Sequence, residues 1–313
     1  MLIDVAQVAG GLVVLLLAGD LLVRGAVNLA LRLGIPALMV GMTVVAFGTS
    51  APELLVSVKA VIRDADGLAL GNVVGSNIAN ILLVIGLPAL IAPMLIGREY
   101  LRDYLMMLAA TGLFGALALT GAIGLWQTLV LLGAFTLFMG DSILRARKAR
   151  QDSIALEGAD DSIATPKLAL FLVLGVIGLP LGASLLVAGA VDIAAALGVS
   201  DVMIGLTIVA VGTSLPELAT TFMAAIRREG GVALGNIIGS NLFNLLFILG
   251  IAGLFGQIDM PPQMMVLDFW VMLAAALVLA PFLWTLRPVG RVTGGALLLA
   301  YAGYIWALIV IGG

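Results

Sequence analysis

The chain has 313 residues, of which 62% are hydrophobic and only 11% are charged. A soluble domain has about 45–50% apolar and about 25% charged residues, so this composition excludes a soluble globular protein and predicts a polytopic membrane protein in a lipid bilayer. The net charge of −3 and the lack of a basic stripe predict no nucleic-acid partner. Because Cys and His are absent, any ion site must be built from oxygen ligands.

Apolar runs long enough to cross a bilayer as helices recur from end to end of the chain. With breaks placed at Gly, Pro and charged residues, the fold class is predicted to be all-α with ten transmembrane helices. The expected spans are residues 7–31, 37–62, 68–91, 100–120, 124–144, 167–196, 202–227, 232–255, 265–286 and 292–312. Segment 145–166 carries charges of both signs, and we expect a flexible linker there between the halves 1–144 and 167–313.

The distribution of Lys and Arg predicts the orientation, because cytoplasmic loops of membrane proteins carry an excess of positive charge. With the linker placed in the cytoplasm, nearly all of these residues fall on its side. Only Lys59 and Arg63 fall on the other side. Arg24 lies within the first span, where Asp20 is expected to neutralise it as an i,i+4 ion pair, with a gating role as the alternative. Both termini are therefore expected outside the cell.

Two segments of the chain recur at a constant spacing of 164 residues. "GMTVVAFGTSAPELLVSV" (41–58) matches "GLTIVAVGTSLPELATTF" (205–222), and "ALGNVVGSNIANILLVIG" (69–86) matches "ALGNIIGSNLFNLLFILG" (233–250). Each repeat holds an odd number of expected spans, so the second enters the membrane inverted, an architecture that transporters use to place a substrate site at the midplane. A duplication retained only for packing is the alternative, but the best-matched segments are the most polar ones.

Pro52 and Pro216 lie in the middle of their expected spans. Proline has no N–H and clashes with the carbonyl four residues back, so we expect each helix to break near 46–52 and 210–216 and to free backbone carbonyls. Broken backbone at membrane depth is tolerated where it lines a cavity or a site. A simple proline kink is the alternative. The carbonyls expected to be freed belong to Ala46, Phe47, Ala210 and Val211.

Each expected break carries a carboxylate and two hydroxyls at helical spacing, on one face of the helix. A charged group at the bilayer centre costs about 2.5–3.5 kcal/mol on insertion scales, so two matched glutamates indicate a function, although protonated structural glutamates are the alternative. The residues are Thr49, Ser50 and Glu53 in the first repeat and Thr213, Ser214 and Glu217 in the second.

The third and eighth expected spans add hydroxyl and amide oxygens on one helix face, from Ser76 and Asn80 and from Ser240 and Asn244. Their GxxxG spacings allow close approach of backbones. Together the two halves offer two carboxylates and many neutral oxygens, which suits Ca²⁺ with its 6–8 oxygen ligands. The same carboxylates can hold Na⁺ ions or protons, and competition for them is a simple physical basis for exchange.

These paired motifs, "GTSAPE" with "GNVVGSN" and "GTSLPE" with "GNIIGSN", resemble the α-repeats of the calcium/cation antiporter superfamily, which includes the Na⁺/Ca²⁺ exchangers. The resemblance extends over essentially the whole chain and is greatest to the prokaryotic branch, which implies an integral protein of the prokaryotic inner membrane. It implies Ca²⁺ and Na⁺ as substrates, and a gate formed by the first and sixth spans, whose glycines fit loosely packed, mobile helices.

The resemblance also implies specific ligand roles. Glu53 and Glu217 would be the shared central carboxylates, and Thr49, Ser50, Thr213 and Ser214 would complete the sodium sites with the carbonyls of Ala46 and Ala210. Ser76, Asn80, Ser240 and Asn244 would be the contributions of the third and eighth spans. The sequence departs from the Na⁺/Ca²⁺ exchangers at Asn244, where they often carry aspartate, which leaves the coupling ion and Ca²⁺ preference open. The H⁺/Ca²⁺ branch usually has GNxxE where this chain has GNVVG and GNIIG, which favours Na⁺ coupling.

Other classes of function fit the sequence less well. An intramembrane hydrolase with Ser50 or Ser214 as nucleophile lacks a base, because His is absent and no Lys lies nearby in sequence. A passive cation channel shares broken helices with transporters and is separated from them by its independence of a counter-gradient. A structural scaffold would have no use for the paired glutamates. We therefore expect no enzyme activity, no cofactor and no obligate protein partner.

Overall fold

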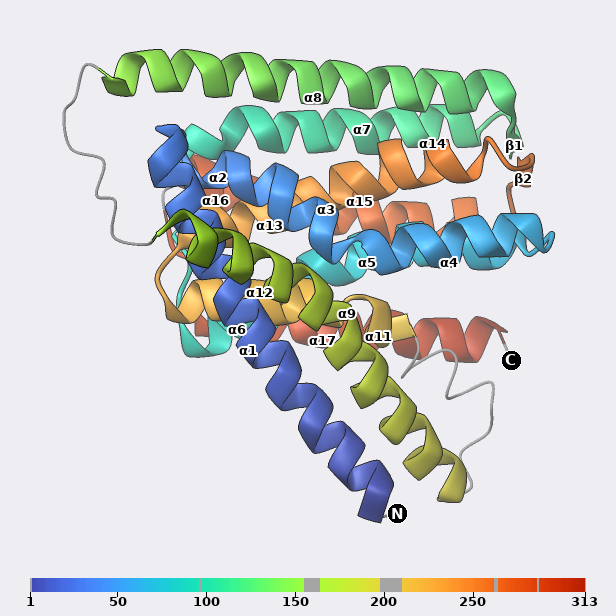
Figure 1. The fold of residues 1–313 in the computed structure, drawn as a ribbon. Coiled ribbons are helices and arrows are strands. Elements are labelled where there is room, and N and C mark those ends of the chain that lie inside the picture. Colours follow the sequence, from blue (N-terminus) through green and yellow to red (C-terminus); the bar gives the residue numbers. More distant parts are fainter. Residues whose placement is uncertain are drawn as a thin grey trace.

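A computed structural model describes residues 2–95, 97–154, 164–197, 210–261, 264–285 and 287–312. The fold is almost entirely helical (Figure 1). Among the described residues, eight helices are long and apolar enough to cross a membrane, and a ninth candidate is a pair of helices bent by 48°. The all-α polytopic class is confirmed, while the count of ten spans stays a prediction because 202–209, the start of the expected seventh span, lies outside the described residues.

The first half of the chain forms a long N-terminal helix, the bent pair, one buried helix, and the two helices along the top edge of Figure 1. Its elements are α1 (Leu2–Leu33), α2 (Ala37–Val40), the π-helical turn η1 (Gly41–Val45), α3 (Ala46–Thr49), α4 (Ala51–Ile62), α5 (Asp66–Leu82), α6 (Gly86–Ile91), the 3₁₀ turn η2 (Arg98–Tyr100), α7 (Leu101–Ala118), β1 (Ala122–Ile123) and α8 (Leu125–Ile154).

The second half follows with the same order of long and broken helices. Its described elements are α9 (Thr165–Ala196), α11 (Ala210–Thr213), α12 (Leu215–Ile226), α13 (Gly230–Leu242), the π-helical η4 (Phe243–Ile248), α14 (Leu249–Ala252), β2 (Ile258–Asp259), the π-helical η5 (Met264–Asp268), α15 (Phe269–Val278), α16 (Ala280–Thr285) and α17 (Arg291–Gly312). The N-terminal end of α1 and the C-terminal end of α17 lie toward the side of the bundle opposite to the C-terminal end of α8 (Figure 1).

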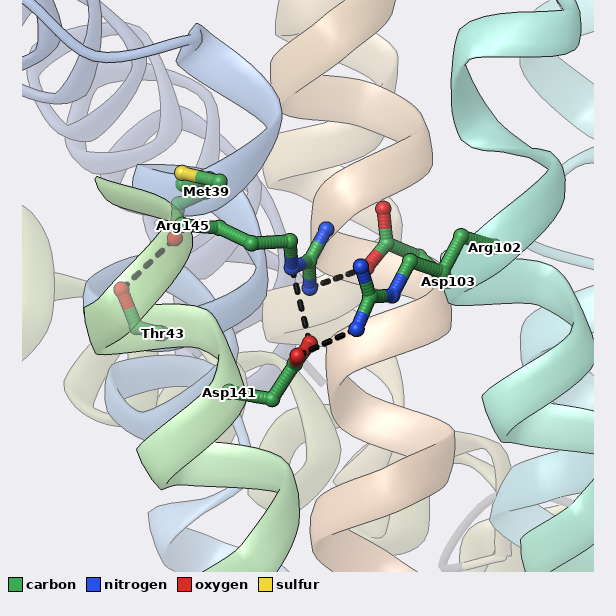
Figure 2. A network of polar contacts seen from close by, with 6 residues as sticks. All are labelled: Met39, Thr43, Arg102, Asp103, Asp141 and Arg145. Carbon is green, nitrogen blue, oxygen red and sulfur yellow. Dashed lines mark hydrogen bonds and ion pairs between the residues drawn. The ribbon is translucent and has the colours of Figure 1, made fainter. Parts of the chain in front are cut away.

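Helix α8 continues past the end of the expected fifth span. It runs to Ile154, so residues 145–154 of the expected flexible linker are helical, and that part of the prediction is wrong. Arg145 bonds to Asp141 one turn earlier, with 2.8 Å between Nε and Oδ2, and to Asp103 of α7 (Figure 2). These ion pairs and the good helix formers Arg, Lys, Ala and Gln after Arg145 carry the helix beyond the apolar stretch. Residues 155–163 of the linker lie outside the described residues.

A two-stranded antiparallel sheet joins the two halves at one end of the bundle (Figure 1), which the all-α prediction does not include. Ala122 pairs with Asp259 and Ile123 with Ile258, and the amide of Met260 donates to the carbonyl of Gly121 at 2.9 Å. The pairing satisfies backbone groups at the ends of helices. Strands of two residues carry no periodic signal, so the sequence could not reveal them.

Helices α1 and α9 pack tightly against each other as an antiparallel pair that runs diagonally across the rest of the bundle (Figure 1). A Cβ added at Gly11 would lie 2.7 Å from the carbonyl oxygen of Gly182, and one added at Gly182 would lie 3.0 Å from that of Gly11. Further along, a Cβ at Gly189 would lie 2.5 Å from the carbonyl oxygen of Asp4. The expected loose packing is therefore wrong for the contact between these two helices, because their glycines let the backbones meet.

Helix α13 is the buried axis of the molecule, and two of its glycines allow the bent pair of the first half to approach. A Cβ at Gly235 would lie 2.5 Å from the carbonyl oxygen of Leu38, and a Cβ at Gly239 would lie 2.6 Å from that of Met42. The expected close approach is confirmed there. At the matching Gly71 and Gly75, no described atom lies within 4 Å of an added Cβ.

We expect Gly239→Ala to destabilise the fold. Its methyl group would collide with the backbone of Met42 and with the Cβ of Ala46, 2.7 Å away, and overpacking of this kind costs about 1–3 kcal/mol. The control is Gly133→Ala in α8, where the glycine is exposed and no described atom lies within 4 Å of the added Cβ. Thermal unfolding of the purified proteins in detergent measures the difference, and equal midpoints for the two variants would contradict the expected clash.

Candidate cation site

The bent pair of the first half changes direction at Ser50, between α3 and α4. Ser50 leaves the helical conformation with φ −86° and ψ 7°, and Ser214, between α11 and α12, has nearly the same angles, φ −84° and ψ 1°. Pro52 and Pro216 lie in the first turns of α4 and α12, where a missing N–H costs nothing. The proline thus begins a new helix in each half.

Each new helix carries its glutamate in the first turn, Glu53 in α4 and Glu217 in α12. The N-terminus of a helix has a partial positive charge from its unpaired N–H groups, which favours a carboxylate. Both glutamates are buried, each 1% exposed. The break therefore places a carboxylate inside the protein at a point where the helix dipole stabilises its charge.

The carbonyls nearest the breaks are less free than the proline argument predicts. The amide of Ser50 donates to the carbonyl of Ala46 at 3.0 Å, and the amide of Ser214 donates to that of Val211 at 3.1 Å. The expectation of freed carbonyls is wrong for Ala46 and Val211, because proline removes the N–H at 52 and 216, whereas the helix turn that ends at the serine is intact. A carbonyl oxygen has two lone pairs, so one acceptor position remains on Val211, whereas the carbonyl of Ala46 also accepts the Thr49 hydroxyl at 3.3 Å.

Hydroxyl groups around Glu217 come from both halves of the chain. The Ser50 hydroxyl donates to Glu217 Oε1 at 3.1 Å, and the Ser240 hydroxyl donates to the same oxygen at 3.5 Å. The Thr49 hydroxyl lies 3.5 Å from that of Ser240. Residues more than 160 positions apart in the sequence thus share one buried polar cluster.

Most of the remaining predicted site residues are buried as well. Asn80 and Asn244 are buried, and so are Ala46, Ser76 and Ser214. Thr213 is half-buried. Ala210 begins α11, and its side chain lies outside the described ones.

Several oxygens in this cluster are buried and accept or donate no hydrogen bond within the described part of the chain. They are Oε2 of Glu53, Oε2 of Glu217, Oδ1 of Asn80, Oδ1 of Asn244 and Oγ of Ser214. An unpaired buried polar group costs about 1–3 kcal/mol, and more for a charged one. An arrangement of acceptor oxygens without donors is what a desolvated cation needs.

Two asparagines that are not among the predicted site residues hydrogen-bond to the backbone of the two glutamates. Asn72 Nδ2 donates to the backbone carbonyl of Glu53 at 3.1 Å and to Ser57 Oγ at 2.9 Å. In the second half, Asn236 Nδ2 donates to the backbone carbonyl of Glu217 at 3.3 Å and to Thr221 Oγ1 at 3.1 Å. Asn236 Oδ1 also accepts the Thr49 hydroxyl at 3.1 Å. The sequence does mark these two residues, because each is the Asn of the "GN" pair that recurs in both repeats.

The charge of the cluster comes from the two glutamates, which are both buried. Within the described ranges, no group of three or more Asp, Glu, His or Cys comes together. The other donors are neutral hydroxyls and amides. The cluster thus combines two buried carboxylates with neutral oxygens, a donor set of the kind that Ca²⁺ and other hard cations prefer.

Comparison with known proteins assigns the chain to a family. A family model described as sodium/calcium exchanger protein matches residues 3–143 and 167–310. The chain belongs to the sodium/calcium exchanger family. The two matched ranges exclude the segment between the halves and include every residue of the buried cluster.

Two prokaryotic relatives match over nearly their whole length. The chain is 38% identical to the putative antiporter CaxA of Alkalimonas amylolytica, with 98% of this chain and 99% of that protein covered. It is 36% identical to the sodium/calcium exchanger MaX1 of Methanosarcina acetivorans, with 96% and 97% covered. A solved structure of the sodium-calcium exchanger NCX_Mj, soaked with zero Na⁺ and Ca²⁺, superimposes with a TM-score of 0.83 at 32% identity, with 100% and 99% covered. The family is one of transporters, so the expectation that the protein is no enzyme agrees with these findings.

Proposed function

We propose that this family member exchanges Ca²⁺ for Na⁺ across the membrane by alternating access, with both cations competing for the cluster around Glu53 and Glu217. The single observation that carries the proposal is the set of buried, unpartnered oxygens contributed by both halves of the chain. Two carboxylates balance one Ca²⁺ or two monovalent ions, and the flexible, oxygen-only donor set suits Ca²⁺ better than Mg²⁺, which keeps its waters.

The ligand set that we propose combines the burial and the contacts of the cluster with the 164-residue repeat, which gives each residue of one half a counterpart in the other. The two glutamates hold the charge, the hydroxyls adjust to ions of different radius, and the amide and backbone carbonyls supply neutral oxygens. The proposed ligands are Glu53, Glu217, Asn80, Asn244, Thr49, Ser50, Thr213, Ser214, Ser76 and Ser240, with the backbone carbonyls of Ala46 and Ala210.

The architecture that we propose is a pair of inverted repeats of five spans each, within the halves 1–144 and 167–313. Reciprocal contacts at the 164-residue spacing support it, because Asn72 with Ser57 has its counterpart in Asn236 with Thr221. The linker 145–166 is placed in the cytoplasm and both termini outside on the excess of Lys and Arg on the linker's side. In a bacterial cell the membrane would be the inner one.

Helices α1 and α9 are the proposed moving gate. Val176 of α9 faces Gly48 beside the first break, where a Cβ would lie 2.8 Å from Val176 Cγ2, and Val187 faces Gly212 beside the second, where a Cβ would lie 2.5 Å from Val187 Cγ2. Small residues at these contacts let one helix slide past another. The tight packing of α1 on α9 supports movement of the two as one body.

Proton coupling is the second candidate, because a buried carboxylate with an unpartnered oxygen can take up a proton as well as a metal ion. A passive channel of the same fold is a third, and it needs no counter-gradient. The name of the relative MaX1 says that it is a sodium/calcium exchanger, which favours Na⁺ coupling here.

A transport assay with the purified protein in liposomes distinguishes Na⁺ coupling, proton coupling and a passive channel. The vesicles are loaded with Na⁺ and diluted into Na⁺-free buffer that contains radioactive Ca²⁺, and parallel samples carry a pH gradient or no gradient. We expect Ca²⁺ uptake only with the outward Na⁺ gradient. Uptake with the pH gradient alone would show proton coupling, and uptake without any counter-gradient would show a channel.

A further inference from the structure

Asn77 and Asn241 are buried at the centre of the molecule, and nothing above gives them a function. They are 2% and 3% exposed and are the asparagines of the two "GSN" motifs, in α5 and α13. Each bonds to the asparagine ligand of the other half. Asn80 Nδ2 donates to Asn241 Oδ1 at 3.1 Å, and Asn244 Nδ2 donates to Asn77 Oδ1 at 3.4 Å.

The far end of each of these two amides faces a methionine sulfur. Asn241 Nδ2 lies 3.3 Å from Met107 Sδ, and Asn77 Nδ2 lies 3.8 Å from Met272 Sδ. A thioether sulfur has no hydrogen and can only accept, so it prefers the NH₂ end of the amide to the carbonyl end. The methionine thereby fixes which end of Asn241, or of Asn77, points toward the opposite half.

The orientation of the Asn241 and Asn77 amides in turn determines the orientation of the Asn80 and Asn244 amides. Because Oδ1 of Asn241 and of Asn77 is an acceptor, the asparagine opposite turns its NH₂ toward it. Its own Oδ1 then points the other way, and in both Asn80 and Asn244 this oxygen is buried without a partner within the described ranges. The two ends of an amide are similar in size, so packing alone does not decide between them, whereas this hydrogen bond does.

We propose that Asn77 and Asn241 are positioning residues that make Asn244 and Asn80 present a carbonyl oxygen, and not an N–H, to the transported cation. Each acts across the interface between the halves, so that the ligand polarity in one repeat depends on the other repeat. A flipped amide would direct two N–H donors at the cation and repel it. The inference rests on the proposed function for the assignment of Asn80 and Asn244 as ligands.

A double-mutant comparison separates positioning from packing. Asn241→Leu keeps the branching at Cγ and the number of side-chain heavy atoms but removes the acceptor that orients Asn80. In a background with Asn80→Asp, both ends of the side chain at position 80 are oxygens, so no orienting partner is needed. Asn77→Leu in the same background is the matched control, because Asn77 orients Asn244 and not the residue at 80.

The measurement is Ca²⁺ binding to the purified protein by titration calorimetry, with thermal unfolding to follow the fold. Loss of a residue that orients a metal ligand costs about 10–100-fold in metal affinity. We expect a loss of this size for Asn241→Leu alone and a loss of less than about threefold for the same substitution in the Asn80→Asp background, since a carboxylate needs no orientation. Asn77→Leu should cost about 10–100-fold in both backgrounds.

Equal losses from Asn241→Leu in the two backgrounds would overturn the inference, and so would an unchanged Ca²⁺ affinity of the folded single variant. If Asn241→Leu does not fold, Asn241→Ala replaces it in the same comparison. The proposed function is judged separately by the wild-type protein, in which Na⁺-driven Ca²⁺ uptake is required. Normal uptake by the wild type with additive losses would therefore reject positioning and leave exchange intact.

Discussion

Glu53→Gln and Glu217→Gln should each abolish Ca²⁺ exchange while the protein remains folded. Glutamine has the shape of glutamate and keeps one carbonyl oxygen, but it removes one of the two negative charges of the buried cluster that we propose as the cation site. Removal of one partner from a buried charged contact costs about 2–5 kcal/mol, which corresponds to a loss of affinity of at least about 30-fold. Na⁺-driven uptake of radioactive Ca²⁺ into liposomes, with equal amounts of protein, measures the effect.

The matched control for these variants is Asp259→Asn. It neutralises one carboxylate in the same way, but Asp259 is exposed, in the short strand β2 at one end of the bundle (Figure 1). We expect its uptake to equal that of the wild type. Uptake at the wild-type rate by Glu53→Gln would mean that the buried cluster is not the transport site, and a fall in all three variants would point to an effect of net charge.

The candidate site could be predicted to the level of residue types and faces. The 164-residue repeat pairs each polar residue with a second copy, and the cost of charge in a membrane indicates that Glu53 and Glu217 have a function. The hydrogen bonds between the halves, such as that of Ser50 to Glu217, depend on how the halves dock, which no pattern within one repeat describes.

The roles of the individual asparagines could not be predicted from the sequence. "GNVVGSNIAN" contains three of them, and an asparagine can act as ligand, as support for the backbone or as a partner of another amide. Helical spacing placed Asn80 with Ser76 on one face, but it could not assign Asn72 to the Glu53 carbonyl or Asn77 to the opposite half. The second repeat also departs from the first, because Asn244 lies in the π-helical η4 whereas Asn80 lies in the regular helix α5.

Ion pairs between residues far apart in the sequence could not be predicted from the sequence either. The expected ion pair between Asp20 and Arg24 is confirmed, with 2.9 Å between Arg24 Nε and Asp20 Oδ2. The structure adds Arg227, at the C-terminal end of α12, as a second partner of Asp20. The i,i+4 rule reveals pairs within one helix, whereas a pair between helices requires the packing to be known.

Arg145→Ala should be among the most destabilising single substitutions in this protein. Figure 2 shows Arg145 between two aspartates, and Nη2 lies 2.6 Å from Oδ1 of Asp103 and Nε lies 2.8 Å from Oδ2 of Asp141. Asp103 is only 1% exposed, and its Oδ2 has no partner in the described part of the chain. Loss of Arg145 leaves a buried carboxylate without compensation, which costs about 3–5 kcal/mol.

Arg102→Ala is the matched control, because Arg102 bonds to Asp141 in the same network but its side chain is 60% exposed. An exposed ion pair contributes about 0–1 kcal/mol, so the two variants should differ by several kcal/mol when unfolding is measured by denaturant titration in detergent. Adding Asp103→Asn to Arg145→Ala should restore part of the loss, because it removes the charge that had been left buried. If Asp103→Asn restores nothing, the cost arises from the packing of the long Arg145 side chain between α7 and α8, and not from the uncompensated carboxylate.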